Sequence, residues 1–335
     1  MRIPLTIHDG GQSALGKAEG RTGAEALCFM FANLPMIYKK LGNTGERIPA
    51  IGLGTWKIPE RSKEGLDAIL EGLNAGARFI DTAEMYANER LVGKAISRFD
   101  ADVFLATKVS PHHFRHDDLI RACDASLDRL GVKCIDLYQL HWPNHSVPIK
   151  ETIGAMEMLA DAGKIRHIGV SNFTVEEMIE AQTSMKRYEI ISNQVEYSPF
   201  SREPESGLLQ FCQKEHITLI AYSPLGRGQI FREKKAMGLL GKISATHGAT
   251  EAQVILSYLI SKENVVAIPK SSNKTHVKEN VSCVDLRLSE MEIKELDGLG
   301  NGSNKPLAGR VLSLFLKNTG VWAKIMEDLE KKRKI

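Results

Sequence analysis

The feature that most constrains the fold is a regular alternation of short apolar runs with longer helical patterns, between about residues 50 and 283. The short runs are rich in β-branched residues, which predicts strands, and the patterns between them repeat apolar residues at spacings of three and four, which predicts helices. This alternation is typical of a parallel sheet. The predicted strands span residues 50–54, 78–81, 103–107, 135–140, 167–169, 191–194, 218–221 and 265–268.

The number of these units favours one architecture. The longest helical patterns span residues 117–130, 149–162, 174–183 and 249–261. Gly76, Gly131 and Gly163 follow helical patterns, where a left-handed residue commonly ends a helix. No G-x-G-x-x-G sequence follows the first strand, as it would in an open dinucleotide-binding sheet. We therefore predict an α/β fold of the closed (β/α)8 TIM barrel type.

Segments on both sides of the barrel predict appendages. Residues 37–41 and 47–50, joined by turn residues 43–45, are expected to form an N-terminal β-hairpin that plugs the bottom of the barrel. Extra C-terminal helices are expected after the barrel. The first would begin with a capping box formed by Ser289 and Glu292, and a glycine-rich loop would lead to the last.

The chain is expected to contain two regions. We predict a poorly ordered extension over residues 1–35 and a single (β/α)8 domain over residues 36–335. Within the extension, residues 11–18 nearly match a phosphate-binding P-loop, but Ala18 stands where that loop carries a magnesium-binding hydroxyl. This near match therefore does not predict a nucleotide site.

Composition excludes several classes of function. With 43% hydrophobic and 25% charged residues, the 335-residue chain has the composition of a folded globular protein. Its net charge of +3 does not indicate a nucleic-acid partner, and no apolar run reaches the roughly 18 to 20 residues that span a membrane. The five cysteines lack zinc-binding spacing, and His112, His113 and His116 are expected to form a solvated cluster. We predict reduced thiols, a cytoplasmic location and no metal site.

Polar residues stand at the ends of three consecutive predicted strands. Asp81 ends the second strand with Tyr86 in the loop after it, Lys108 follows the third, and His141 follows the fourth. These strand ends converge at the mouth of a TIM barrel. Reduction of a carbonyl by hydride needs a proton donor, and a tyrosine with a pKa of about 10 donates weakly at neutral pH. We expect Lys108 to lower the pKa of Tyr86, Asp81 to hold Lys108, and His141, with Trp142, to orient the substrate oxygen.

Each of these residues alone has an ordinary structural explanation. Asp81 could cap a turn, Lys108 could be a solvated charge, and Tyr86 could be an interface tyrosine. Only their conjunction at neighbouring strand ends favours a catalytic site.

Seven motifs, in order, resemble those of the aldo-keto reductases. They are residues 52–56 (GLGTW), 79–83 (FIDTA) followed by Tyr86, 107–108 (TK), 140–143 (LHWP), 168–173 (IGVSNF), 193–197 (NQVEY) and 268–271 (IPKS). The resemblance extends over nearly all of residues 37–282. It implies a barrel that reduces aldehydes or ketones, sugars among them, or oxidises the corresponding alcohols. Asp81, Tyr86, Lys108 and His141 would form the catalytic tetrad, with Tyr86 as the general acid.

The resemblance also implies an extended nicotinamide dinucleotide as cofactor. Ser171, Asn172 and Gln194 would hydrogen-bond the carboxamide of the nicotinamide, and Tyr222 would stack on its ring. Ser223 and Leu225 would border the pyrophosphate. The other implied cofactor residues are Thr55, Asp81, Lys270, Ser271, His276, Glu279 and Asn280.

One of these positions departs from the family pattern. Where the family usually has an arginine that stacks on the adenine and pairs with the 2′-phosphate, this chain has His276. A histidine is largely neutral at pH 7 and cannot make a planar bidentate contact. Lys270 and Ser271 still suit a 2′-phosphate, so NADP(H) is expected as the cofactor, and NAD(H) stays open as an alternative.

The implied substrate pocket combines Trp56, Tyr86, His141 and Trp142 with the loop after residue 298. Two indole rings favour flat or apolar carbonyl compounds. His141 stands where the family's enone reductases have glutamate, which favours reduction of C=O over C=C.

Two other classes of protein share some of these residues. A non-catalytic cofactor-sensing barrel subunit could keep all four tetrad residues, so that alternative stays open. A short-chain dehydrogenase is excluded, because its tyrosine and lysine lie one helical turn apart, whereas 21 residues lie between Tyr86 and Lys108. Both a monomer and a homo-oligomer are compatible with the sequence.

Overall fold

The computed structural model describes residues 36–299, and its centre is a sheet of eight parallel strands. The strands follow one another in chain order, as in a (β/α)8 TIM barrel, so the predicted fold is confirmed. They are β3 (Leu53–Gly54), β4 (Phe79–Asp81), β5 (Phe104–Val109), β6 (Ile135–Leu140), β7 (Ile165–Ser171), β8 (Ile190–Glu196), β9 (Thr218–Tyr222) and β10 (Val265–Ile268).

Backbone pairing between the first and last strands closes the ring. Ile51 forms a parallel bridge with Ala267 of β10. The N–H of Ala267 donates to the carbonyl of Ala50, and the N–H of Gly52 donates to the carbonyl of Ala267, both at 2.9 Å. The segment just before β3 therefore supplies the pairing that the short β3 lacks.

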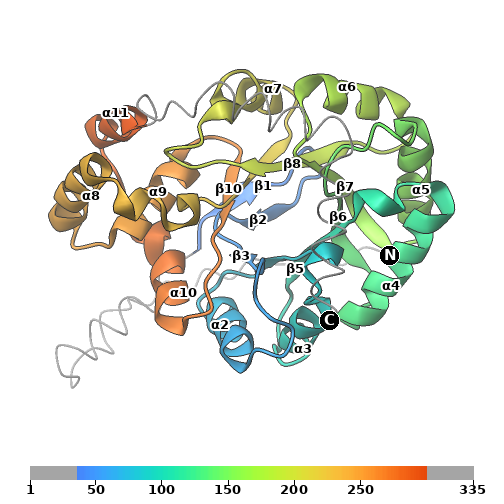
Figure 1. Ribbon diagram of the computed structural model, residues 1–335, viewed down its shortest axis with the longest axis horizontal. Helices are drawn as coiled ribbons and strands as arrows, with labels where there is room; N and C mark the ends of the chain where they lie inside the picture. The colour runs from blue at the N-terminus through green and yellow to red at the C-terminus, as the bar shows by residue number, and fades with distance from the viewer. Residues whose placement is uncertain (1–35, 300–335) are drawn as a thin grey trace, which may run out of the picture. The chain divides into compact units, whose positions relative to one another are not determined.

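Helices surround the strands, as Figure 1 shows. They are α2 (Lys63–Asn74), α3 (Glu89–Ile96), α4 (His116–Leu130), α5 (Ile149–Asp161), α6 (Val175–Ser184), α7 (Leu208–Lys214), α8 (Lys234–His247), α9 (Glu251–Ser261), α10 (Lys274–Val281) and α11 (Glu290–Asp297). Gly76, Gly131 and Gly163 have φ angles of 99°, 68° and 69° at or just after the ends of α2, α4 and α5. The three predicted helix ends are therefore confirmed.

The predicted strands are all present, but β7 and β8 extend beyond their predicted limits at both ends. The extra residues at the start of β7 include the polar Arg166. In the structure its guanidinium pairs with Glu46 and Asp136. Ion pairing thus lets β7 begin in a polar stretch that apolar patterning does not detect.

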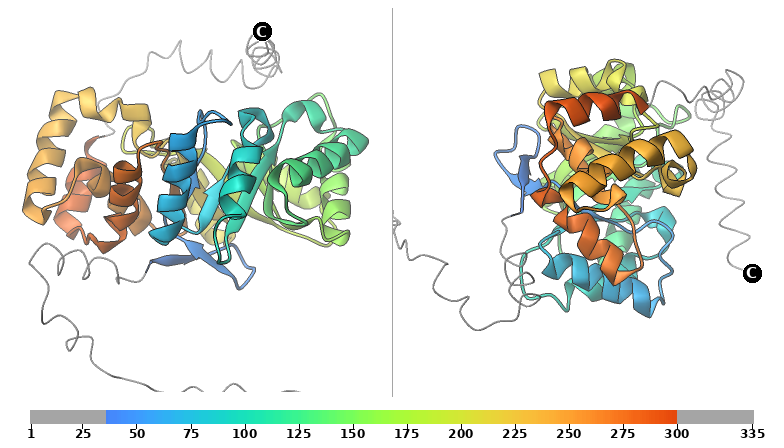
Figure 2. Two further views of the ribbon diagram at one scale, coloured as in Figure 1. Left: turned by 90° about the horizontal axis from the view of Figure 1, so that it is seen from below. Right: turned by 90° about the vertical axis from the view of Figure 1, so that its left-hand side faces the viewer.

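A hairpin of β1 (Tyr38–Lys40) and β2 (Arg47–Pro49) lies across the end of the barrel where the strands begin, as Figure 2 shows at left. Thr218, the first residue of β9, accepts the N–H of Gly42 at 2.9 Å and donates to the carbonyl of Lys40 at 3.0 Å. Leu41 and Ile48 are buried inside the barrel. They pack there with Phe79, Ala106, Leu137, Ile191, Ile220, Val266 and Ile268. The expectation that the hairpin closes the bottom is confirmed.

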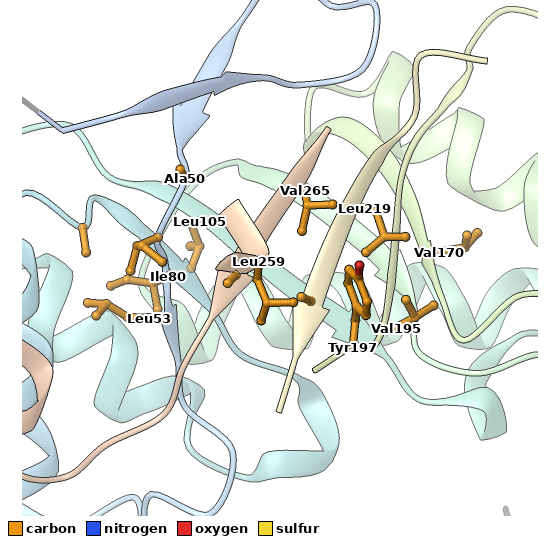
Figure 3. Close-up of a cluster of buried hydrophobic side chains, with 14 of the residues drawn as sticks. Ala50, Leu53, Ile80, Leu105, Val170, Val195, Tyr197, Leu219, Leu259 and Val265 are labelled. Atoms are coloured by element: carbon orange, nitrogen blue, oxygen red, sulfur yellow. The ribbon is translucent and has the colours of Figure 1, made fainter. Parts of the chain in front are cut away.

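A second apolar layer lies between the strands and the helices. Because side chains alternate along a strand, those that do not point into the barrel pack outward against the helices. Figure 3 shows part of this layer, including Leu219 of β9, Val265 of β10 and Leu259 of α9, which are all fully buried. Each such side chain stabilises the fold by about 1.5 to 3 kcal/mol, and the barrel is thereby a rigid support for its mouth.

The last described helix, α11, begins at the predicted capping box. The N–H of Glu292 donates to Ser289 Oγ at 3.3 Å, and the N–H of Ser289 donates to Glu292 Oε2 at 2.7 Å. The predicted extension over residues 1–35, with its near match to a P-loop, and the segment from residue 300 onward lie outside the described residues. Within residues 36–299, no helix is long and apolar enough to cross a membrane.

Candidate active site

Polar side chains form a layer inside the barrel above the apolar one. Phe79 and Ala106 of the apolar layer lie two residues before Asp81 and Lys108, on the same face of their strands. Gln139 and His141 continue the inward face of β6 in the same way. The change from apolar to polar residues along each strand therefore places the ionisable groups at the mouth.

A buried ion pair is the centre of this polar layer. Lys108 Nζ lies 2.6 Å from Asp81 Oδ1, and the two side chains are 0% and 2% exposed. The same ammonium donates to the carbonyl of Thr82 at 2.8 Å. Burial lowers the pKa of Lys108 below its ordinary value, while the charge of Asp81 and its hydrogen bond oppose that shift.

Tyr86 lies beside this ion pair, at the end of the short 3-10 turn η2 (Glu84–Tyr86). Lys108 Nζ is 3.4 Å from the Tyr86 hydroxyl and 4.9 Å from the centroid of its ring. The Tyr86 and His141 rings meet edge to face, with centroids 5.6 Å apart. The structure thus brings all four predicted tetrad residues together.

The predicted lowering of the Tyr86 pKa is wrong for this structure. Burial and, secondly, the negative charge of Asp81 raise the pKa of Tyr86 well above its ordinary value of 10.0. The positive charge of Lys108 is compensated by the carboxylate that holds it, so desolvation of the hydroxyl decides the direction. Tyr86 therefore keeps its proton at neutral pH.

His141 is neutral in this environment. Burial and the nearby positive charge of Lys108 lower its pKa well below the ordinary value of 6.5. Its main-chain carbonyl accepts a hydrogen bond from Asn172 Nδ2 at 3.2 Å. Its Nδ1 is buried and has no hydrogen-bond partner among the described residues. A neutral imidazole has one donor and one acceptor nitrogen, which suits the orientation of a polar ligand.

Gln139 belongs to the site, although the sequence analysis did not select it. It is fully buried on β6, directly opposite Lys108 in the strand register. Its Nε2 donates to Asp81 Oδ2 at 3.3 Å, and its Oε1 accepts from Gln194 Nε2 at 3.4 Å. The available signal was a polar residue two positions before His141 on the inward face of an otherwise apolar strand.

The predicted nicotinamide residues form one hydrogen-bonded group on the neighbouring strands. Ser171 Oγ donates to the carbonyl of Gln194 at 2.9 Å, and Asn172 Nδ2 donates to Ser171 Oγ at 2.9 Å. The Tyr222 hydroxyl donates to Asn172 Oδ1 at 2.9 Å, which fixes its ring. Gln194 Nε2 donates to Asp81 Oδ2 at 2.7 Å and so connects this group to the buried ion pair.

This group has the polar atoms that a nicotinamide carboxamide needs. Gln194 uses its Nε2 for Asp81 and Gln139. Its Oε1 acceptor forms no hydrogen bond within residues 36–299, so it is available to an amide N–H. The ring of Tyr222, held through its hydroxyl by Asn172, offers a flat face for stacking. These residues fit the cofactor that the sequence implied.

The residues predicted for the phosphate and adenosine end lie in three places, after β9, after β10 and on α10. Ser223 and Leu225 are in the loop after β9, where Ser223 has a left-handed φ of 50°. Lys270 and Ser271 follow β10. The remaining three lie on α10, where Asn280 is buried, Glu279 is half-buried and His276 is exposed.

Two lysines at this end favour an anionic ligand. Burial and, secondly, the charge of Lys57 lower the pKa of Lys270. Lys270 Nζ donates to Ser272 Oγ at 3.0 Å, and Lys57 Nζ lies over the Trp56 ring at 4.4 Å. Neither ammonium forms an ion pair with a carboxylate in the described part of the chain. Two neighbouring ammonium groups without a carboxylate are suited to phosphate oxygens.

Thr55, Trp56 and Trp142 border the mouth. The Thr55 hydroxyl donates to the carbonyl of Asp81 at 3.0 Å, so it supports the strand end. Trp56 is 37% exposed, with the Arg227 guanidinium 5.4 Å from its centroid, and Trp142 is half-buried. An exposed indole at the rim is available to a substrate.

Two of the three histidines after β5 lie beside carboxylates. His113 Nδ1 lies 2.8 Å from Glu84 Oε1, and His116 Nδ1 lies 2.8 Å from Asp117 Oδ1. Within residues 36–299, no group of three or more His, Cys, Asp or Glu side chains has the arrangement of a metal site.

Comparison with known proteins places the chain in a family. Residues 50–301 match the model described as the aldo/keto reductase family. The methylglyoxal reductase YeaE of Escherichia coli (strain K12) is 38% identical over 257 residues, which cover 75% of this chain and 90% of that protein.

Solved structures agree with this match. A thermostable aldo-keto reductase crystallised with the inhibitor epalrestat has a TM-score of 0.73 at 43% identity, covering 79% of this chain and 100% of that one. An aldo-keto reductase from Klebsiella pneumoniae in complex with NADPH has a TM-score of 0.74 at 35% identity, covering 81% and 98% of the two chains.

The closed barrel and the ionisable groups at its mouth define an oxidoreductase that acts on carbonyl or alcohol groups. The chain belongs to the aldo/keto reductase family, and the resemblance found in its sequence is confirmed.

Proposed function

We propose that this protein reduces aldehydes and ketones to alcohols with NADPH, and that Tyr86 is the proton donor. The observation that carries the proposal is the position of Lys108 Nζ, 2.6 Å from Asp81 Oδ1 and 3.4 Å from the Tyr86 hydroxyl. The bound nicotinamide supplies the hydride in this chemistry. The protein supplies the proton and holds the groups that deliver it.

The charges of the site suit this role. Tyr86 keeps its proton because its pKa is raised by burial and by Asp81. An alkoxide is a far stronger base than a phenolate, so Tyr86 gives up its proton as the substrate oxygen becomes negative. The ammonium of Lys108 then stabilises the phenolate that forms, and Asp81 keeps that ammonium in place. The neutral His141 orients the substrate oxygen beside the Tyr86 hydroxyl.

The cofactor residues support NADP(H) as the cofactor. Ser171, Asn172 and Gln194 would hold the carboxamide, and the ring of Tyr222 would stack on the nicotinamide. Lys270 and Lys57 would contact phosphate oxygens. The solved relative from Klebsiella pneumoniae binds NADPH, which supports the same assignment here. His276 in place of an arginine weakens the preference for NADPH, so use of NADH is expected at a lower rate.

The pocket favours small or flat carbonyl compounds. Trp56 and Trp142 offer apolar faces at the mouth, where an aldehyde or ketone would lie against them. The relative from Escherichia coli is a methylglyoxal reductase, and methylglyoxal is therefore the first substrate to test.

The decisive experiment follows NADPH absorbance with methylglyoxal, aromatic aldehydes, ketones and sugars, for the wild type and for Tyr86→Phe. We expect kcat to fall by about 10² to 10⁴ in Tyr86→Phe, because the acid is lost. Tyr188→Phe is the matched control, because its hydroxyl donates to Asp161 at 3.0 Å on the surface.

Two results would contradict the proposal. If Tyr86→Phe and Tyr188→Phe both keep the wild-type rate, Tyr86 is not the proton donor. If the wild type binds NADPH and reduces no carbonyl, the alternative of a cofactor-sensing barrel is favoured instead.

A further inference from the structure

Asn88 is a fully buried amide that connects the two loops that follow β3 and β4 at the barrel mouth. It is the N-cap residue of α3 and lies two residues after Tyr86. Its Nδ2 donates to the carbonyl of Thr55 at 2.8 Å and to the carbonyl of Ile58 at 3.0 Å. Its Oδ1 accepts the hydroxyl of Thr82 at 2.8 Å. Both N–H donors of the amide are therefore used, each on a different carbonyl.

Two partners of Asn88, Thr82 and Thr55, also form hydrogen bonds with the residues of the buried ion pair. The carbonyl of Thr82 accepts a hydrogen bond from Lys108 Nζ at 2.8 Å. Thr55 holds the carbonyl of Asp81 with its N–H at 3.1 Å and with its hydroxyl at 3.0 Å. Hydrogen bonds from one side chain thus reach the loops that follow β3 and β4, and these loops flank both members of the ion pair.

The turn that carries Trp56 depends on the same amide. The N–H of Ile58 donates to the carbonyl of Thr55 at 3.0 Å, which closes a turn around Trp56. Asn88 Nδ2 contacts the carbonyls at both ends of this turn. The buried Asn88 side chain therefore helps to set the position of the Trp56 indole at the mouth.

The backbone between Tyr86 and Asn88 needs support. Ala87 has a φ of 53°, a left-handed conformation that a residue with a Cβ rarely adopts. Such a conformation persists when the residues on both sides of it are fixed. The N–H of Ala87 donates to the carbonyl of Glu84 at 3.2 Å on one side, and the buried Asn88 amide anchors the other. This arrangement holds the backbone next to Tyr86 and so determines the direction of the Tyr86 side chain.

We propose that Asn88 is a positioning residue for carbonyl reduction: its amide sets the distance between the Tyr86 hydroxyl and Lys108 and holds Trp56 at the mouth. This inference rests on the proposed function. Asn88 acts through Thr82, Thr55 and the Tyr86 turn. Loss of a purely structural amide would lower stability alone. Loss of a positioning amide also lowers kcat, even while the cofactor site is intact.

The test compares two buried threonines. Thr82→Val removes the hydroxyl that donates to Asn88 at 2.8 Å and keeps the Thr82 carbonyl that accepts from Lys108. Thr152→Val is the matched control, because Thr152 is equally buried and its hydroxyl donates to the carbonyl of Phe114 on the outer side of the barrel at 2.9 Å. Asn88→Ala removes all three side-chain bonds. For each variant, kcat and KM are measured with methylglyoxal, Kd for NADPH by quenching of protein fluorescence, and Tm by circular dichroism.

We expect kcat to fall about tenfold in Thr82→Val and about 100-fold in Asn88→Ala, as a small misplacement of a reacting group does. The Kd for NADPH should stay within about threefold of the wild type in Thr82→Val, because this change removes only the hydroxyl that donates to Asn88 and leaves the bond from Asn88 to Thr55 in place. Thr152→Val should lower Tm about as much as Thr82→Val and leave kcat unchanged. If Asn88→Ala does not fold, the comparison of Thr82→Val with Thr152→Val still tests the positioning role.

The results distinguish a failure of the positioning role from a failure of the proposed function. If the wild type reduces carbonyls and Thr82→Val keeps its kcat, or if Thr152→Val loses as much kcat as Thr82→Val, the positioning role is wrong and the proposed function stands. A parallel loss of NADPH affinity and kcat in Thr82→Val would also overturn the positioning role. If the wild type reduces no carbonyl, the proposed function itself is wrong, and the role of Asn88 falls with it.

Discussion

Replacement of Asp81 by asparagine should destabilise the fold strongly, because it leaves the Lys108 ammonium buried without a counter-ion. The two groups are 2.6 Å apart, and at an effective dielectric constant of about 20 their Coulomb attraction is about 6 kcal/mol. Desolvation of both charges offsets most of that attraction. Removal of one partner leaves the desolvation cost of the other uncompensated, so we expect Asp81→Asn to lose about 3 to 5 kcal/mol of unfolding free energy at pH 7.

The double variant Asp81→Asn/Lys108→Met separates this effect from a general loss of packing. It removes both charges, so we expect it to recover about 2 kcal/mol or more relative to Asp81→Asn alone. Urea unfolding followed by circular dichroism measures the four free energies of the cycle. If the loss of stability in the double variant equals the sum of the losses in the two single variants, the two groups do not interact as argued.

The same cycle has a pH dependence of known sign. Burial lowers the pKa of Lys108 below 10.5 in the folded protein, and the attraction of Asp81 opposes this shift. In Asp81→Asn the attraction is lost, so the pKa falls further. Between that lower pKa and 10.5 the unfolded chain binds more protons, and stability rises by up to about 1.4 kcal/mol per pH unit. The deficit of Asp81→Asn relative to the wild type should therefore shrink as the pH rises from 7 toward 10.5, and a constant gap would refute the reasoning.

Three further outcomes are expected. In Gly93→Ala the added Cβ would lie 2.2 Å from the carbonyl oxygen of Leu130, so the free energy of unfolding should fall by about 1 to 3 kcal/mol in a thermal unfolding measurement. In Gly154→Ala the added Cβ meets no atom within 4 Å, so the free energy of unfolding should rise by about 0.5 to 1 kcal/mol. Equal effects of the two changes would contradict the packing argument. His276→Arg should raise the ratio of kcat/KM for NADPH over NADH about tenfold by adding a bidentate phosphate contact, and an unchanged ratio would place the 2′-phosphate elsewhere. Because the pKa of His141 is lowered well below 6.5, the unfolded chain takes up a proton below that pH that the folded chain does not. Stability should therefore fall by up to about 2 kcal/mol between pH 6.5 and 5, and His141→Asn should lack this part of the loss.

Much of the fold and the tetrad could be predicted because the signals are local or periodic. Strand patterns identified the positions of Asp81, Lys108 and His141 at the strand ends, and the barrel geometry then required them to meet. Gln139 had a signal of the same kind, but a single polar residue within a strand is also compatible with a satisfied core amide. Its role became visible only through its contacts with Asp81 and Gln194.

Other features of the site could not be read from the sequence. Asn88 bonds to residues 33 and 30 positions earlier in the chain, and no spacing rule connects them. The direction of the Tyr86 pKa depends on how deeply its hydroxyl is buried, whereas the sequence shows only which charges are nearby. Residue identity therefore predicted the partners of Tyr86 and gave the wrong sign for their net effect.

The hairpin closes the bottom of the barrel in the described part of the chain, residues 36–299. Leu41 and Ile48 fill the end where the strands begin, and the apolar residues packed above them separate that end from the polar layer. Solvent and ligands are therefore expected to reach Asp81 and Lys108 from the mouth. A ligand bound at the mouth covers the entrance to any ligand bound deeper in the barrel. The deeper ligand is therefore expected to bind first and to leave last.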